Sequence, residues 1–410
     1  MFAALAVSGC QFVELKQELK EMEKFTAIEG TIVQEHLNDA PVAVALFSNS
    51  LKRKNLINAK LIDGRKFQFF APPGKYFLFA FEDRNRDFNY QQDREPAGYF
   101  GNPSAIVLEK GAHRTGVQIL LRPNLVLPTS DEPAPAADTP LANKFPKLWA
   151  GRRNVGAVTA LTDSRFDKKF ATMGLWKPLQ YSLELGPGLF LLAPHDAAKT
   201  PVLFVHGIGG SPRAWQTMID SLDRDRFEPW IFQYASGLPL NANVEFLFDA
   251  VTQLRLVHRV DAMHLVAHSM GGLVSQGFLN RHKTGTAGYL KSFTSLSTPW
   301  GGHNAAKLGV KFSPVVVPVW RDIAPASDYL AKLRQSALPP GLPHYLFFGH
   351  RDAQADTKGA DDGVVTVASQ REPSALRRAS KIYGVRTSHA GILSDMTVLR
   401  IFNAMLNHGD

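Results

Sequence analysis

The stretch Met263–Leu273 reads MHLVAHSMGGL, and it decides the fold of the second half of the chain. An apolar run leads into a serine at position 269, and two glycines follow Met270. This is the pattern G-x-S-x-G with Ala267 in place of the first glycine. A strand that turns directly into a helix exposes the serine hydroxyl and needs small neighbours. The stretch therefore predicts a nucleophile elbow at Ser269.

Strand-like and helix-like patterns alternate around this elbow. Apolar strand runs cover 201–206, 229–234 and 263–267, and helical patterns cover 212–225 and 243–260. Alternation of this kind predicts a mostly parallel sheet that is covered by helices on both faces. In such sheets ligands bind at the carboxyl ends of the strands, where Ser269 stands.

A glycine-rich loop follows the first of these strands, in VLFVHGIGGSP from Val202 to Pro212. The strand stops at His206, and Gly207, Gly209 and Gly210 come next. Glycines commonly end strands without further purpose. The alternative is a loop whose bare backbone N–H groups approach a substrate oxygen.

From about residue 150 to the end, the AHSMGG and HGIGG motifs resemble an α/β-hydrolase of the bacterial lipase and esterase type. The resemblance implies a serine hydrolase that cleaves carboxylic esters through an acyl-enzyme, with Ser269 as nucleophile and no organic cofactor. It also implies an oxyanion hole made by the backbone N–H groups of Ile208 and Met270. The residues expected to shape the site are His206, Gly207, Gly209, His268 and Gly271.

The fold family orders its triad as serine, acid and histidine along the chain. His389 lies after a short strand and before the terminal helix, where the family keeps its histidine. His350, at the end of the strand HYLFFGH, is the alternative. His303, in TPWGGH, resembles a segment that lines the site.

The acid lies in RDAQADTKGADDGVV, where four aspartates compete. DDGVV resembles the NDG-x-V motif of bacterial lipases, which implies Asp362. Asp352 is the alternative if the acid stands directly at the strand end. Asp361 is expected to be a surface or metal-binding neighbour, and Asp356 completes the set. We predict a solvated loop here and no metal site.

Residues 26–123 show short β-rich runs of period two separated by turn signals, and they predict a small all-β sandwich. FQFFAPPGKYFLFAFED resembles prealbumin-like modules. The acidic loop after it is a poor calcium site, because Phe88 and Arg94 stand where an EF-hand needs glycine and glutamate. A polar hairpin loop is expected instead.

The chain begins with MFAALAVSGC, which resembles the end of a lipoprotein signal segment covering residues 1–10. VSGC resembles the bacterial lipobox, which implies a lipidated Cys10 as membrane anchor, although no Lys or Arg precedes the apolar run. Gln11 after the cysteine favours, by the same resemblance, the outer membrane of a bacterial envelope. The alternative is a chance apolar terminus with a buried thiol.

Two segments connect these parts. Residues 11–25 carry apolar side chains at helical spacing and predict a helical tether, either amphipathic beside a membrane or a solvated spacer. Residues 124–147 are rich in proline and alanine and predict a linker. The catalytic domain then covers residues 148–410. Within it, residues 300–343 lack a strand pattern and predict either a lid or acyl-binding wall, or packed core under a cap helix.

The composition of the chain narrows the classes of molecule that it is expected to bind. The 410 residues carry a formal charge of +9 and one cysteine, so the charge suits an anionic surface and no intrachain disulfide can form. The basic residues are scattered without zinc-finger spacing, which argues against nucleic acid. An ester or lipid substrate and a membrane are the expected partners, with no obligate protein partner. An acyltransferase with the same triad and a non-catalytic binding lipoprotein remain as alternatives.

Overall fold

Two β-sheets form the N-terminal domain of the computed structural model, which describes residues 9–34, 40–51, 55–62, 64–87, 89–101, 103–111, 113–126, 154–282, 287–352 and 359–407. One sheet has the order β4-β1-β8, with β1 (Thr26–Val33), β4 (Lys66–Ala71) and β8 (Arg114–Leu120). The other has the order β3-β2-β5-β6, and a further strand, β7, pairs with β5. Its strands are β2 (Val42–Ser48), β3 (Leu56–Ile62), β5 (Gly74–Glu82), β6 (Ala97–Tyr99) and β7 (Ile106–Leu108).

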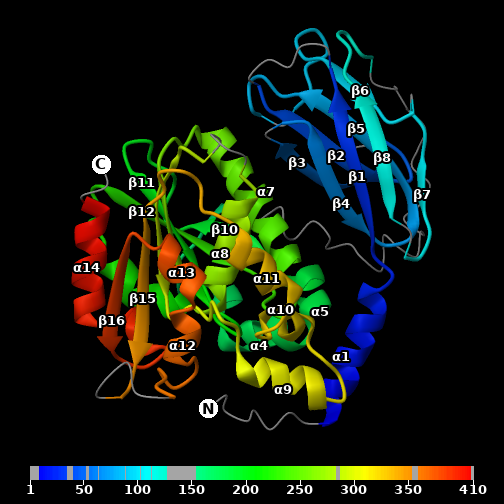
Figure 1. The fold of residues 1–410 in the computed structure, drawn as a ribbon. Coiled ribbons are helices and arrows are strands. Elements are labelled where there is room, and N and C mark those ends of the chain that lie inside the picture. Colours follow the sequence, from blue (N-terminus) through cyan, green and yellow to red (C-terminus); the bar gives the residue numbers. More distant parts are fainter. Residues whose placement is uncertain are drawn as a thin grey trace.

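Alternating side chains hold these sheets together. Ile28 and Ile32 of β1 face Val44 and Leu46 of β2 in one apolar core. The opposite face of the second sheet packs on Leu256 of the long helix α7 (Leu240–His258). The predicted β-sandwich is confirmed, and Figure 1 shows it standing against α7.

The C-terminal domain is built on an eight-stranded sheet of order β16-β15-β14-β13-β11-β12-β10-β9. Neighbouring strands are parallel except for the antiparallel pair β10 and β12. The strands are β9 (Val155–Val158), β10 (Gly188–Leu191), β11 (Thr200–Val205), β12 (Phe227–Gln233), β13 (Met263–His268), β14 (Leu290–Leu296), β15 (His344–His350) and β16 (Lys381–Arg386). The predicted mostly parallel sheet is confirmed.

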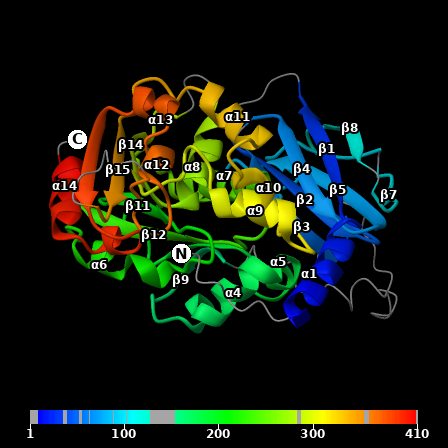
Figure 2. The same ribbon diagram turned by 60° about the horizontal axis from the view of Figure 1, so that its bottom comes forward.

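Helices cover both faces of this sheet because its strands are apolar on both sides. Leu203 and Val205 of β11 face one core, whereas Val202 and Phe204 face the other. The first core is closed by α4 (Lys168–Trp176), α7, α8 (Met270–Asn280), α10 (Pro318–Ile323), α11 (Asp328–Gln335) and α13 (Pro373–Arg378). The second is closed by α6 (Gln216–Asp220) and α14 (Met396–Asn407), and both layers can be followed in Figure 2.

One predicted helix is shorter than expected. The stretch 212–225 forms a 3-10 turn, Pro212–Trp215, followed by α6, which ends at Asp220. The Ser221 hydroxyl donates to the Met218 carbonyl and competes with continuation of the helix.

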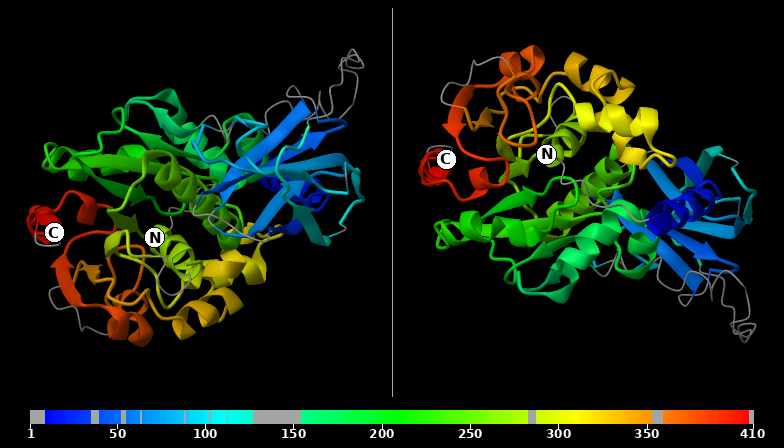
Figure 3. Two further views of the ribbon diagram at one scale, coloured as in Figure 1. Left: turned by 90° about the horizontal axis from the view of Figure 1, so that it is seen from above. Right: turned by 90° about the horizontal axis from the view of Figure 1, so that it is seen from below.

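The helix near the N-terminus is not a solvated spacer, so that part of the prediction is wrong. It runs as α1 from Gly9 to Met22, and Leu15 is completely buried in the core of the C-terminal domain. The Glu18 carboxylate accepts the backbone N–H groups of Leu179 and Gln180, at the start of α5 (Pro178–Glu184). Figure 3 shows α1 beside α5.

Some predictions fall outside the described residues. They include residues 1–8 of the signal-like segment and most of the predicted linker, since residues 127–153 are not described. The acidic loop after β5 is described apart from Phe88. There Asp83 accepts the N–H of Asp87, and Glu95 accepts the N–H groups of Arg84 and Gln91. In the part of the chain that the structure covers, no helix has both the length and the apolar composition to cross a bilayer.

Candidate active site

Ser269 occupies a sharp turn between β13 and α8. Its backbone has φ 55° and ψ −131°, which is a strained conformation for a residue with a side chain. The turn is possible because its neighbours are bare. A Cβ on Gly271 would lie 2.3 Å from the carbonyl oxygen of Val205, and one on Gly207 would lie 2.7 Å from Cβ of Ser269. The elbow thus has the local geometry that its sequence predicts.

A chain of hydrogen bonds joins Ser269, His389 and Asp362. Oγ of Ser269 lies 2.9 Å from Nε2 of His389, and Nδ1 of His389 lies 2.7 Å from Oδ2 of Asp362. With the proton on Nδ1, the imidazole donates to the carboxylate and its Nε2 accepts from the serine hydroxyl. The structure therefore brings together the three residues named from the sequence.

The competing residues lie apart from this chain. The ring of His350 donates from Nδ1 to the Asp352 carbonyl, and Asp361 pairs with Arg351 at the surface. The ring of His303 donates from Nε2 to the carbonyl of Val364, so it borders the acid's loop without reaching Ser269. Asp356 lies outside the described residues.

Asp362 is held as a buried carboxylate. Its exposed fraction is zero, and Oδ1 accepts the backbone N–H groups of Val364 and Val365. Burial acts to raise the pKa of Asp362, but the hydrogen bonds from His389 and the backbone outweigh it and hold the pKa below its usual value. The group is therefore ionised at neutral pH and can stabilise a charged imidazolium.

Two backbone N–H groups follow residues at the turn, since Ile208 comes after Gly207, which packs against Ser269, and Met270 comes directly after Ser269. Among the described residues neither donates to another group, whereas Gly209 N–H donates to Oγ of Ser236. Gly209 adopts φ +60°, a conformation that favours glycine. The placement suits an oxyanion hole, because the two donors sit at the loop after β11 and at the N-terminus of α8.

His206 shapes the loop from within the core. Its Nδ1 donates to the carbonyl of Gly207, and its ring stacks on Tyr234 with centroids 4.3 Å apart. The Tyr234 hydroxyl donates to the His206 carbonyl. Burial lowers the pKa of His206 to about 4, so the ring is neutral at neutral pH.

His268 does more than the sequence suggested, because it holds His389 through the backbone. Its Nε2 donates to the carbonyl of His389 at 2.8 Å, while the N–H of His389 donates to the carbonyl of Asp362. Trp215 meets the His268 ring edge-on at 6.3 Å. Burial lowers the pKa of His268 to about 3, which keeps the ring neutral. Its position directly before the nucleophile was the only sequence signal for this role.

Acid should destabilise the fold through three buried histidines, His206, His268 and His344. Burial lowers the pKa of His344 to about 3 as well. Because each histidine binds a proton more readily when unfolded, with a pKa near 6.5, stability is complete above that pH and is lost as pH falls toward 4. We expect the free energy of unfolding to fall by up to about 4 kcal/mol per pH unit in that range.

Urea unfolding at pH 7 and pH 5 measures this loss. His344→Gln is the matched variant, because glutamine can still pair with the Ser295 hydroxyl that Nε2 contacts. The free energy of unfolding of this variant should depend less steeply on pH, because unfolding would take up about one proton fewer. An unfolding midpoint that is the same at both pH values would contradict the prediction.

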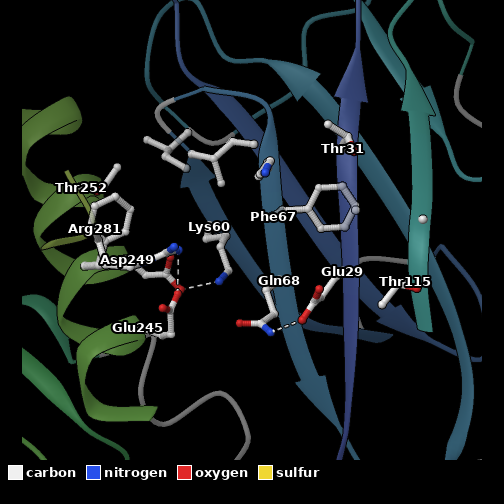
Figure 4. Close-up of a pocket in the computed structure, with 16 residues that line it drawn as sticks. Glu29, Thr31, Lys60, Phe67, Gln68, Thr115, Glu245, Asp249, Thr252 and Arg281 are labelled. Atoms are coloured by element: carbon white, nitrogen blue, oxygen red, sulfur yellow. Dashed lines mark hydrogen bonds and ion pairs between the residues drawn. The ribbon is translucent and has the colours of Figure 1, made fainter. Parts of the chain in front are cut away.

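A separate cleft of about 470 Å³ lies between the N-terminal sheets and α7. Figure 4 shows its walls, where Lys60 pairs with Asp249 and Arg281 pairs with Glu245. None of Ser269, His389 and Asp362 lines it. The Lys60–Asp249 pair links the two domains, so we assign this cleft to the domain interface.

Residues 300–343 contain three short helices, namely α9 (Asn304–Phe312), α10 and α11. Val317 and Val319 are completely buried, as packed core requires. His303 accepts the N–H of Ala305 and caps α9 beside the loop of Asp362. The region thus combines core packing with a position at the edge of the site.

Comparison with known proteins finds similarity in the second half of the chain. Residues 202–395 match the family model described as Alpha/beta hydrolase family. The curated protein 1-acylglycerol-3-phosphate O-acyltransferase ABHD5 of Rattus norvegicus is 25% identical over 139 residues, which are 32% of this chain and 38% of that protein. The Mus musculus protein of the same name matches to the same extent. The chain thus spans well under half the length of these relatives.

Solved structures of lipases are also similar. Bacillus licheniformis lipase BlEst2 in mature form matches with a TM-score of 0.43 and 20% identity, covering 53% of this chain and 97% of that one. Aspergillus fumigatus lipase B matches with a TM-score of 0.42 and 15% identity, covering 54% and 57%.

Proposed function

We propose that this chain, in which residues 202–395 match the Alpha/beta hydrolase family model and Ser269 stands at the elbow, is a serine hydrolase of carboxylic esters. One observation carries the proposal, namely the hydrogen-bonded series Ser269, His389 and Asp362. A serine at its ordinary pKa is a weak nucleophile, and this arrangement supplies the base and the orienting group that it needs.

In the proposed reaction, Oγ of Ser269 attacks the ester carbonyl while Nε2 of His389 takes the hydroxyl proton. Asp362 keeps the His389 proton on Nδ1 and stabilises the imidazolium. The N–H groups of Ile208 and Met270 donate to the oxyanion. The intermediate collapses to the acyl-enzyme, and the alcohol leaves with the proton from Nε2. Water then repeats the sequence and releases the acid.

An acyltransferase is the second candidate, and the partial match to a protein named 1-acylglycerol-3-phosphate O-acyltransferase is compatible with it. The same residues would form the acyl-enzyme, and an alcohol would take the place of water. Product analysis with and without an added alcohol acceptor separates the two activities, because hydrolysis releases free acid and transfer yields a new ester.

A fluorophosphonate probe tests the proposal directly. We expect it to modify Ser269 and to abolish turnover of model esters in proportion to labelling, since the probe requires an activated serine. A series of acyl chain lengths then defines the substrate class. A folded chain that resists the probe and turns over no ester would instead support a non-catalytic binding lipoprotein.

We further propose that Cys10 is lipidated and anchors the chain in a bacterial envelope, in the outer membrane by the Gln11 pattern. Each buried CH₂ contributes about 0.8 kcal/mol, and stable anchoring takes more than one acyl chain. Membrane pelleting should therefore resist a high-salt wash and yield to detergent, and the pelleting that resists the wash should disappear in Cys10→Ser. A Cys10→Ser chain that still pellets after the wash would contradict this anchor.

A further inference from the structure

Helix α9 presents a stripe of two apolar and two basic side chains to solvent, Lys307, Leu308, Lys311 and Phe312. Leu308 is 56% exposed and Phe312 is 68% exposed, and both lysines are exposed. Residues three and four apart share one side of a helix, so these four form a continuous surface. We call them the α9 stripe.

The opposite side of α9 is firmly packed. Ala306 is buried, and a Cβ on Gly309 would lie 2.7 Å from the ring of Trp320. The helix therefore has a fixed inner face, and the α9 stripe is the outer face that this packing leaves in water. Large apolar side chains in such a position usually mark an interaction surface.

The charged side chains along the sequence that contains the α9 stripe have one sign. From Gly301 to Arg321 the sequence contains no aspartate or glutamate, whereas Lys307, Lys311 and Arg321 are basic. The Lys311 ammonium lies 5.0 Å from the centre of the Phe312 ring. Lysines beside exposed Phe and Leu are typical of helices that lie in the headgroup layer of anionic bilayers, where the ammonium stays in water and the ring enters the acyl boundary.

The α9 stripe lies close to the catalytic residues. His303 caps α9 and donates to the carbonyl of Val364, and the N–H of Val364 donates to Asp362. A nine-residue helix is about 13 Å long, so the stripe is within one short helix of the acid's loop. In Figure 1, α9 lies on the side toward which the arrows of β15 and β16 point.

Helix α9 also lies near the start of α1. Trp320, under α9, meets Trp176 edge-on at 5.8 Å, and Trp176 meets Phe12 of α1 edge-on at 6.2 Å. The ribbon views agree that α9 and α1 lie side by side (Figure 1 and Figure 3). A surface that touches the bilayer through α9 thus brings Cys10 and the loop of Asp362 toward the same membrane.

We propose that the α9 stripe docks on an anionic phospholipid bilayer and holds the Ser269 site against it. Bilayer lipids would then be the substrates, which rests on the proposed ester hydrolysis, whereas the docking itself does not. Both apolar and electrostatic attraction contribute, so binding should be stronger on anionic than on zwitterionic vesicles and should weaken with salt.

Vesicle co-sedimentation of the full chain carrying Cys10→Ser, which removes any acyl anchor, tests the docking. The vesicles are phosphatidylcholine with or without phosphatidylglycerol. Leu308→Ser with Phe312→Ser should weaken binding to the anionic vesicles at least about tenfold. Lys307→Gln with Lys311→Gln should remove most of the preference for anionic vesicles, at roughly fivefold per lysine.

Matched controls come from the β-sandwich. Val107, also 68% exposed, gives Val107→Ser, and the exposed Lys110 gives Lys110→Gln; both should bind as the parent does. Hydrolysis of a short soluble ester is measured in every variant and should not change. Docking is overturned if the parent does not bind anionic vesicles, or if Val107→Ser weakens binding as much as the stripe variants. A parent that binds but turns over no ester supports docking and overturns the proposed hydrolysis.

Discussion

Ser269→Ala should lower kcat for ester hydrolysis by about 10⁴- to 10⁶-fold, and His389→Ala should do nearly the same. The residues act as a unit, because the hydroxyl is a useful nucleophile only while Nε2 of His389 can take its proton. Their effects should therefore not add, and the double variant should be no slower than about the worse single one. Steady-state kinetics with a soluble ester measure this.

Thermal unfolding controls for the fold. Ser269→Ala removes one hydrogen bond and leaves the elbow backbone as it is, so its midpoint should stay close to that of the parent. His389→Ala deprives Asp362 of its side-chain partner, but two backbone N–H groups still solvate the carboxylate. A folded Ser269→Ala chain with parental activity would rule out the mechanism.

Asp362→Asn should be the most damaging of three aspartate substitutions, at about 10⁴-fold in kcat. An amide at this position cannot stabilise the imidazolium, and it favours the wrong His389 tautomer by donating its own hydrogen to Nδ1. Asp361→Asn and Asp352→Asn should stay within about threefold, because neither side chain contacts His389.

The three aspartate variants are compared at equal folded concentration, with circular dichroism as the check. The pH profile adds a second measure, since Asp361→Asn and Asp352→Asn should keep the parental dependence of kcat on pH. If Asp352→Asn is the slowest of the three, the strand-end alternative is correct and the assignment of Asp362 is wrong.

Sequence was sufficient for those parts of the site that depend on local backbone geometry. The elbow requires small residues at Ala267 and Gly271, and the loop requires glycine at Gly207. The sequence motifs therefore predict the backbone geometry directly. The alternation of strands and helices likewise required a mostly parallel sheet. Asp362 was one of four candidate aspartates. It was selected because DDGVV resembles the NDG-x-V motif, since the spacing of the aspartates alone did not distinguish them.

The rest depended on contacts between distant segments. The helical spacing of α1 showed an apolar face but not the surface it would meet, so the burial of Leu15 could not be foreseen. His268 was expected to shape the site, but its bond to the His389 carbonyl joins residues 121 positions apart. The exposed face of α9 could not be predicted from the sequence either, because hydrophobic periodicity alone does not show which side of a short helix is packed.

The docking of α1 changes what a minimal enzyme would be. Its Glu18 carboxylate occupies the first N–H groups of α5, and its Leu15 fills a gap in the core of the distant domain. A chain trimmed to begin at residue 148 would lose α1. The apolar surface around Trp176, which Phe12 of α1 contacts, would then be exposed to water. The linker thus divides the chain into two segments, but the C-terminal segment is not a complete folding unit because α1 belongs to its core. A shortened enzyme would need α1 added back, even as a separate peptide, to recover its solubility.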